Sequence, residues 1–147
     1  MKNKTVLLVE DNSDDEVLML CALRKNNIES TVHVVRDGQE ALDFLLGDPN
    51  KSAEGSVTPL PHMVLLDLKL PKVDGLEVLQ RLRANERTRT IPIIVMTSSI
   101  EKRDLAESYS RGANSYVRKP VDFSQFVEAT RQLGLYWLVL NETPYRD

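Results

Sequence analysis

Polar side chains that could carry chemistry stand at the ends of four short apolar runs in the sequence. They are Glu10 with Asp11, Asp67, Thr97 and Lys119. Three carboxylates held together would repel one another strongly unless a cation lay among them. Hard oxygen ligands in that number favour Mg²⁺, which binds through one or two carboxylates together with phosphate oxygens. The residue types therefore predict a site for Mg²⁺ and a phosphoryl group.

Each side chain of such a site has its own expected role. A carboxylate beside Mg²⁺ can attack a donor phosphorus and form an aspartyl phosphate. Asp67 is the expected nucleophile because it stands alone after the most apolar run, and Lys119 is the expected counter-charge for the phosphoryl oxygens. Thr97 can donate its hydroxyl to a phosphoryl oxygen once that group is attached.

Five apolar runs predict the strands that would position these groups. They comprise residues 6–9, 32–35, 63–66, 93–96 and 116–117. Continuous apolar runs are typical of strands buried on both faces, and helical patterns occupy the segments between them. This alternation predicts an α/β fold, a five-stranded parallel sheet with helices on both faces. Ligands of such sheets bind beyond the carboxyl ends of the strands, where the polar groups stand.

Two of the helical segments begin with capping patterns. Ser13 and Asp74 each precede a glutamate by three residues, as in a capping box. In the first helix, Val17, Leu20 and Cys21 share one face, which we expect to be buried.

The fourth helical segment, residues 101–111, is mostly polar. Its apolar residues are Leu105, Ala106 and Tyr109. We expect this helix to bury only a narrow stripe and to leave a broad solvated face.

Composition limits the class of protein. The chain has 147 residues, with 19 basic and 22 acidic side chains and a formal net charge of -3. This suits one domain and argues against autonomous nucleic-acid binding. The single cysteine, Cys21, permits no intramolecular disulfide, and no apolar run reaches the length of a membrane span or signal peptide. We therefore expect a cytoplasmic protein with no membrane or nucleic-acid partner.

The motifs at the strand ends occur together and in a characteristic order. They read LLVEDNS at residues 7–13, LLDLKLP at 65–71, DG at 74–75, MTS at 96–98 and YVRKP at 116–120. This joint pattern, from about residue 4 to residue 133, resembles the receiver domain of two-component response regulators. The resemblance implies a flavodoxin-like (βα)5 fold in which Asp67 accepts a phosphoryl group from a sensor histidine kinase.

The resemblance also implies the roles of the remaining site residues. The implied metal ligands are Glu10, Asp11, Asp67 and the backbone carbonyl of Lys69. Thr97 and Lys119 would contact the phosphoryl group, and Tyr116 would be the aromatic switch residue whose rotamer reports the state. The peptide bond between Lys119 and Pro120 would be cis, which X-Pro bonds tolerate. Catalysis would be limited to the protein's own phosphorylation and dephosphorylation, so the chain would not be an enzyme in the usual sense.

At finer resolution the chain resembles the single-domain response regulators associated with bacterial phytochromes. The long connection over residues 47–61 and the apolar residues 133–141 carry this narrower likeness. It implies a homodimer formed through the side of the fifth helix and a light-sensing kinase as the phosphoryl donor. We expect residues 1–134 to form the receiver and residues 135–147 to form an apolar tail. The tail could contact a second copy or fold back on its own domain, and we favour the homodimer contact.

Two other functions fit parts of the pattern. A haloacid dehalogenase-like phosphohydrolase would need a second aspartate two residues after the nucleophile, and Lys69 stands there. A docking receiver that works without phosphate would not need the complete set of site residues that the sequence carries. We therefore expect a phosphorylation-controlled signalling module that acts through protein contacts.

Overall fold

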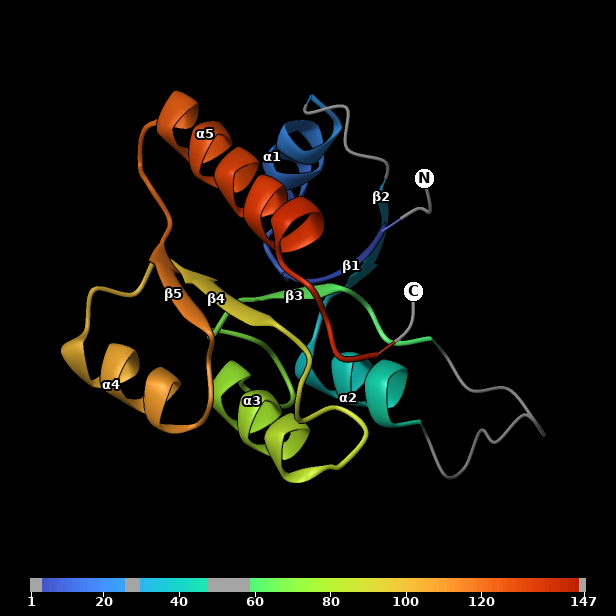
Figure 1. Cartoon of the computed structure of the whole chain (residues 1–147). Helices are drawn as coiled ribbons and strands as arrows, with labels where there is room; N and C mark the ends of the chain where they lie inside the picture. The colour runs from blue at the N-terminus through green and yellow to red at the C-terminus, as the bar shows by residue number, and fades with distance from the viewer. Residues whose placement is uncertain (1–3, 26–29, 48–58, 146–147) are drawn as a thin grey trace.

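The computed structural model describes residues 4–25, 30–47 and 59–145. Within them, five strands form one sheet: β1 (Lys4–Val9), β2 (Ser30–Val35), β3 (Met63–Leu66), β4 (Ile93–Thr97) and β5 (Ser115–Arg118). The α-helices are α1 (Ser13–Arg24), α2 (Gly38–Leu46), α3 (Gly75–Ala84), α4 (Lys102–Ser110) and α5 (Phe123–Gly134). Neighbouring strands are all parallel, in the order β2-β1-β3-β4-β5 (Figure 1). The predicted α/β fold with a five-stranded parallel sheet is confirmed.

The helices form a layer on each face of the sheet, with α1 and α5 on one side and α2, α3 and α4 on the other (Figure 1). Successive residues of β1 point to opposite faces, so Leu7 joins the core beneath α2 and α3 while Leu8 joins the core beneath α1 and α5. Each fully buried side chain of this kind stabilises the fold by roughly 1.5–3 kcal/mol. The two edge strands, β2 and β5, are only partly buried, unlike the central three.

The first helix differs from its expected form in both cap and face. Its N-cap is Asn12, one residue before the predicted Ser13, and the Asn12 side chain accepts a hydrogen bond from the Asp15 N–H. The buried residues are Met19, Ala22 and Leu23, while Val17 is exposed and Cys21 is half-buried. The prediction of a buried face around Val17 was wrong. The run from residue 17 to 23 is apolar on every side, so only the packing against the sheet and α5 selects the buried face.

Helix α4 buries only a narrow stripe and leaves a broad solvated face, as predicted, but its buried residues are polar. Asp104 and Ser108 are its buried residues, whereas Leu105 and Tyr109 are exposed. The polar stripe faces inward because Asp104 forms contacts with polar groups at the end of β4 and in the loop after β3, described below. An expectation based on hydrophobicity alone fails for a helix whose inner face contacts a polar site.

Helix α5 continues directly into a π-helical segment, Leu135–Leu140. The Asn141 N–H donates to the Tyr136 carbonyl, five residues back, at 2.7 Å. Leu138 is buried in the same core cluster as Phe126 of α5, so part of the apolar tail folds against its own domain.

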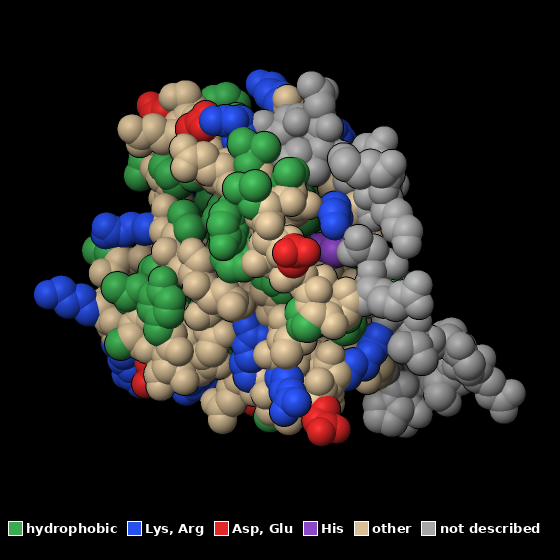
Figure 2. All heavy atoms as spheres, in the orientation of Figure 1, with side chains coloured by type: hydrophobic (Ala, Val, Ile, Leu, Met, Phe, Trp, Pro, Cys, Tyr) green, Lys and Arg blue, Asp and Glu red, His purple; other side chains and the backbone are tan. Residues whose placement is uncertain are grey.

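The rest of the π-helical segment remains on the surface. Tyr136, Val139 and Leu140 are exposed. Figure 2 shows hydrophobic side chains gathered on the face where α5 ends. One side of the segment is thus covered by its own domain, and the other side is exposed; the homodimer contact stays a prediction.

The Lys119–Pro120 peptide is trans, so the implied cis bond is wrong; in the trans form Lys119 still reaches the carboxylates. Most of the long connection over residues 47–61 lies outside the described residues. No helix among residues 4–25, 30–47 and 59–145 is long and apolar enough to cross a membrane.

Candidate functional site

The carboxyl ends of β1 and β3 place two acids side by side. The strands pair Val9 with Leu66, and the next residues are Glu10 and Asp67. Backbone hydrogen bonds continue past the strands, because Glu10 N–H donates to the Val35 carbonyl at 3.0 Å and Asp67 N–H donates to the Val9 carbonyl at 3.1 Å. These bonds hold the backbone of both acids rigidly at one edge of the sheet.

The ends of β4 and β5 complete the same crevice. Lys119 N–H donates to the Thr97 carbonyl at 2.7 Å, which joins the two segments just beyond the strands. Glu10, Asp67, Thr97 and Lys119 are all buried, and Asp11 is exposed at the rim. The predicted convergence of these side chains at one edge of the sheet is present in the structure.

Lys119 is the charge centre of the crevice. Its Nζ donates to Glu10 Oε1 at 2.7 Å, to Asp67 Oδ2 at 2.9 Å and to Asp15 Oδ2 at 2.7 Å. These contacts use all three N–H bonds of the ammonium. The buried cation thus neutralises part of the charge of the acids around it.

Asp15 is a member of this cluster that the sequence reasoning missed. It lies in the first turn of α1, where acidic residues are common for electrostatic reasons alone. The run Ser13-Asp14-Asp15-Glu16 indicates only a helix start. Nothing in the local pattern distinguishes Asp15 from Asp14, because only the packing of α1 beside the end of β5 brings Asp15 to Lys119.

The acids of the crevice fit a divalent cation. One carboxylate oxygen from each of Glu10, Asp11 and Asp67 lies within 4.8 Å of the others. Glu10 Oε2 also accepts from the Asn12 N–H at 3.1 Å, and Asp67 Oδ1 accepts from the Lys69 N–H at 3.3 Å. The cluster presents hard oxygen donors, the chemistry that Mg²⁺ and Mn²⁺ select.

Burial and the crowding of acids perturb the ionisation of this site. Burial raises the pKa of Glu10 to about 7, and the neighbouring Asp67 adds to the rise, although the hydrogen bond from Lys119 opposes it. Burial would by itself lower the pKa of Lys119, but the carboxylates of Asp15, Asp67 and Glu10 raise it above its usual value. Lys119 is therefore a permanent cation, whereas Glu10 holds its charge only weakly without a metal.

Thr97 and Tyr116, the expected switch residues, lie on the two adjacent strands β4 and β5. The Thr97 hydroxyl is buried and accepts a hydrogen bond from the Ser99 N–H at 3.2 Å. Burial raises the pKa of Tyr116, and the nearby Ser99 side chain opposes this rise.

Helix α3 begins against the backbone of Asp67. Asp74 caps the helix by accepting from the Glu77 N–H at 3.0 Å, as the capping pattern predicted. A Cβ atom on Gly75 would lie only 2.3 Å from the Asp67 carbonyl oxygen. The Asp-Gly pair at this position therefore both starts the helix and allows it to approach the central acid.

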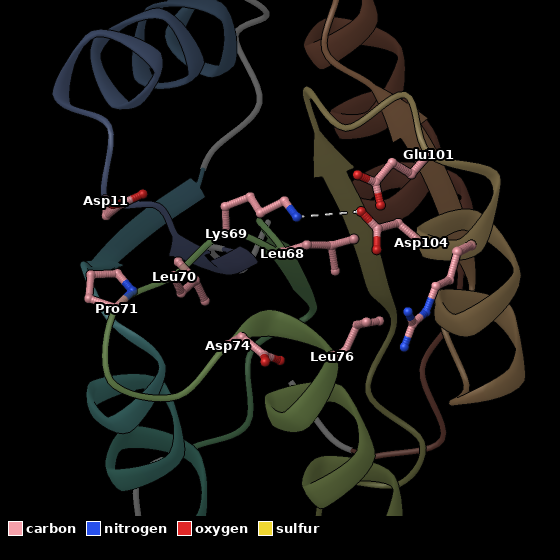
Figure 3. Close-up of a pocket in the computed structure, with 10 residues that line it drawn as sticks. Asp11, Leu68, Lys69, Leu70, Pro71, Asp74, Leu76, Glu101 and Asp104 are labelled. Atoms are coloured by element: carbon pink, nitrogen blue, oxygen red, sulfur yellow. Dashed lines mark ion pairs between the residues drawn. The ribbon is translucent and has the colours of Figure 1, made fainter.

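A cavity of about 520 Å³ opens beside the crevice, between the loop after β3 and the start of α4 (Figure 3). The polar residues that line it are Asp11, Lys69, Asp74, Glu101, Arg103 and Asp104. Lys69 Nζ lies 3.7 Å from Asp104 Oδ2, the pair that Figure 3 marks with a dashed line. The cavity thus lies beside the acid cluster, and a second hollow of about 310 Å³ lies against Lys119 and Asp15.

A family model for the response regulator receiver domain matches residues 6–131. The chain therefore belongs to the response regulator receiver family, which is a class of signalling domains and not a classical enzyme family. The resemblance inferred from the sequence motifs is confirmed. Receiver domains bind Mg²⁺ or Mn²⁺ at an acidic site, and the cluster of Glu10, Asp11 and Asp67 provides such a site here.

Among curated proteins, a probable methanogenesis regulatory protein, FilR2 of Methanothrix harundinacea, is 41% identical over 95% of this chain and 86% of its own length. Among solved structures, a phosphorylated cyanobacterial phytochrome response regulator, RcpA, has a TM-score of 0.88 and 33% identity, over 98% of this chain and 100% of its own. A bacteriophytochrome response regulator, RtBRR, has a TM-score of 0.72 and 48% identity, and the match covers 97% of this chain and 85% of that one.

A further structure contains a metal. The Mn²⁺-bound form of the response regulator Rcp1 has a TM-score of 0.86 and 32% identity, and the match covers 97% of this chain and 99% of that one. The chain is thus similar along nearly its whole length to single-domain response regulators, including phytochrome-associated ones.

Proposed function

We propose that this receiver accepts a phosphoryl group on Asp67 from a sensor histidine kinase, with Mg²⁺ bound beside it. The observation that carries the proposal is the position of Lys119, whose ammonium bridges Glu10 and Asp67 within a cluster of oxygen ligands. This arrangement has a nucleophile, a metal site and a fixed counter-charge within hydrogen-bond reach. The expected ligands of the ion are Glu10, Asp11, Asp67 and the backbone carbonyl of Lys69.

In the transfer, a carboxylate oxygen of Asp67 attacks the phosphorus of a phosphohistidine. The new bond joins that oxygen to phosphorus, the bond from phosphorus to the imidazole nitrogen breaks, and its electron pair leaves with the imidazole. Lys119 exchanges one of its present carboxylate partners for a phosphoryl oxygen and stabilises the charge that collects there. Bound Mg²⁺ would supply further positive charge to the same oxygens.

Phosphorylation would be reported through Thr97 and Tyr116. The new group carries about -1.5 to -2 charge and attracts the Thr97 hydroxyl as a donor. A shift of Thr97 would leave space on the inner side of β5, into which Tyr116 could turn. The position of Tyr116 on β5, next to the strand that ends in Thr97, supports this step.

The partners we propose are a phytochrome-type sensor kinase in the cytoplasm and a second copy of this chain. The phytochrome link is supported by the printed names of RcpA and RtBRR, whereas FilR2 is named for methanogenesis. We assign residues 1–134 to the receiver and residues 135–147 to a tail with a dimer contact. The exposed side chains of Tyr136, Val139 and Leu140 support this contact.

The two competing functions have weaker support. A haloacid dehalogenase-like enzyme needs an acid at the position of Lys69, and the Lys69 ammonium here pairs with an acid of α4. A phosphate-independent docking domain would have no use for a cluster of metal-type ligands such as Glu10, Asp11 and Asp67.

Intact mass spectrometry after incubation with Mg²⁺ and acetyl phosphate tests the proposal. We expect the wild type to gain one phosphoryl mass and Asp67→Asn to gain none. Asp11→Asn serves as the metal-site variant and is expected to be labelled more slowly, with a higher requirement for Mg²⁺. An unlabelled wild type, or equal labelling of Asp67→Asn, would refute the assignment of Asp67.

A further inference from the structure

One acid outside the crevice stands between two elements of the site. Asp104 lies in the first turn of α4 and is buried, although it belongs to a helix whose apolar residues face solvent. Its Oδ2 accepts a hydrogen bond from Ser99 Oγ at 2.6 Å and faces Lys69 Nζ at 3.7 Å. Asp104 thus joins the start of α4 to the segment after β4 and to the loop after β3.

Lys69 is the mobile member of this contact. Its backbone N–H donates to Asp67 Oδ1 at 3.3 Å, so the residue starts beside the expected phosphoryl acceptor. Its side chain is mostly exposed and reaches across the cavity to α4 (Figure 3). Because the stem is flexible and the pair is partly solvated, the ammonium can exchange Asp104 for a stronger anion nearby.

The cavity beneath this bridge opens beside Asp67, because Asp11 of the acid cluster and Lys69 of the loop after β3 line it. A second hollow lies against Lys119 and Asp15 on the other side of the crevice. A water that hydrolyses the aspartyl phosphate must attack phosphorus in line with the bond to Asp67. An ammonium that turns from the cavity to the phosphoryl group would obstruct a water on that side.

We propose that Asp104 is a positioning residue for the dephosphorylation of Asp67, which it promotes by holding the Lys69 ammonium away from the phosphoryl group. This inference rests on the proposed function. In the step concerned, a water oxygen bonds to phosphorus, the bond from phosphorus to Asp67 breaks, and the Asp67 carboxylate leaves with the electron pair. Hydrogen phosphate forms and one proton passes to the solvent.

Removal of the Asp104 charge separates this role from a structural one. In Asp104→Asn the side chain can still accept from Ser99, but Lys69 loses its anionic partner and turns to the phosphoryl group. There it covers the side from which water attacks. We expect the phosphorylated form to live about two to five times longer than the wild type, the range expected for the loss of one partly exposed ion pair.

A double-mutant cycle tests the route through Lys69. Lys69→Met sets the reference lifetime for the cycle, because it removes the ammonium without removing the Asp104 charge. Asp104→Asn with Lys69→Met should have the same lifetime as Lys69→Met. A lengthening relative to Lys69→Met that persists in the double variant would overturn the proposal, because Asp104 would then act through Ser99 or α4.

The measurement is the decay of the phosphorylated mass after acetyl phosphate is removed by desalting, with Mg²⁺ retained. Glu101→Gln is the matched control, since Glu101 also lines the cavity at the start of α4; its lifetime should equal that of the wild type. Asp104→Ser is measured in parallel and should also lengthen the lifetime, so the test does not depend on the folding of one variant.

An unchanged or shorter lifetime in both Asp104 variants would refute this inference alone. An unlabelled wild type would refute the proposed function and this inference with it.

Discussion

At the residue scale, Lys119 links the stability of the protein to its chemistry. A buried ammonium stabilises the fold only while acids surround it, and the buried acids Glu10 and Asp67 in turn depend on the ammonium. Removal of one member of a buried ion cluster leaves the others uncompensated, at a cost of about 3–5 kcal/mol. The same charges that hold the crevice closed are those that a phosphoryl group would meet.

We predict that Lys119→Met lowers the free energy of unfolding by about 3 kcal/mol in EDTA near pH 7.5. Saturating Mg²⁺ should restore more stability to this variant than to the wild type, because the ion replaces the missing positive charge. Urea unfolding with and without Mg²⁺ measures both effects. Equal responses of the two proteins to Mg²⁺ would show that the metal does not lie among the acids that Lys119 contacts.

The raised pKa of Glu10 predicts a pH dependence in the metal-free protein. The unfolded Glu10 carboxyl has its ordinary pKa of 4.5, and the folded one has a pKa of about 7. Between these values the folded state binds more protons, so this group stabilises the fold below pH 4.5 and loses that contribution as the pH rises through 7. In EDTA, the wild type should lose roughly 2–3 kcal/mol more between pH 5 and pH 8 than Glu10→Gln. Parallel pH profiles of the two proteins in urea unfolding would contradict the raised pKa.

At the element scale, the start of α3 sets the distance between that helix and Asp67. A side chain on Gly75 would collide with the Asp67 carbonyl, which is backbone and cannot rotate away. We therefore predict that Gly75→Ala destabilises the protein by about 1–3 kcal/mol and slows phosphorylation, because α3 or Asp67 must shift.

Asp74→Ala is the matched control for Gly75→Ala on the same helix start. It removes the cap on the Glu77 N–H and should cost about 1 kcal/mol of stability without displacing Asp67. Thermal unfolding and acetyl phosphate labelling of both variants decide the matter. If Asp74→Ala slows labelling as much as Gly75→Ala does, the loss follows from helix stability and not from the contact with Asp67.

The helices also show how far a pattern of hydrophobic residues predicts packing. In α3 the apolar residues Val78, Leu79 and Leu82 form one stripe, and all three are buried. In α1 the apolar residues surround the helix, so the sequence does not predict which side of the helix is buried. In α4 the buried residues are polar, because Asp104 is held by Ser99 from the end of β4.

At the scale of the whole molecule, the π-helical segment has one side buried in the domain and one side exposed. Leu138 is buried in the domain, whereas Leu140 is exposed. We predict that Leu138→Ala costs about 2–5 kcal/mol of stability by opening a cavity. The pair of substitutions Val139→Ser and Leu140→Ser should change the stability by less than about 0.5 kcal/mol per residue.

If this exposed side contacts a second copy, the Val139→Ser and Leu140→Ser variant should also dissociate at concentrations where the wild type is dimeric. Urea unfolding combined with sedimentation velocity gives both readouts on the same samples. A wild type that stays monomeric at high concentration, or a variant that dimerises equally well, would reject the tail as a dimer contact.

By itself the sequence determined the α/β class, the parallel order of strands and helices, and the convergence of Glu10, Asp67, Thr97 and Lys119. It could do so because buried parallel strands are continuous apolar runs, and their carboxyl ends must meet at one edge. Only the tertiary structure decided that Asp15 and Asp104 join the site. Each is one acid in a polar stretch near a helix start, and its partner lies in a strand end or loop that helix packing brings near. Such a contact forms only if the helix turns the right side toward the sheet. A helix without a single apolar stripe gives no sequence signal for which side that is.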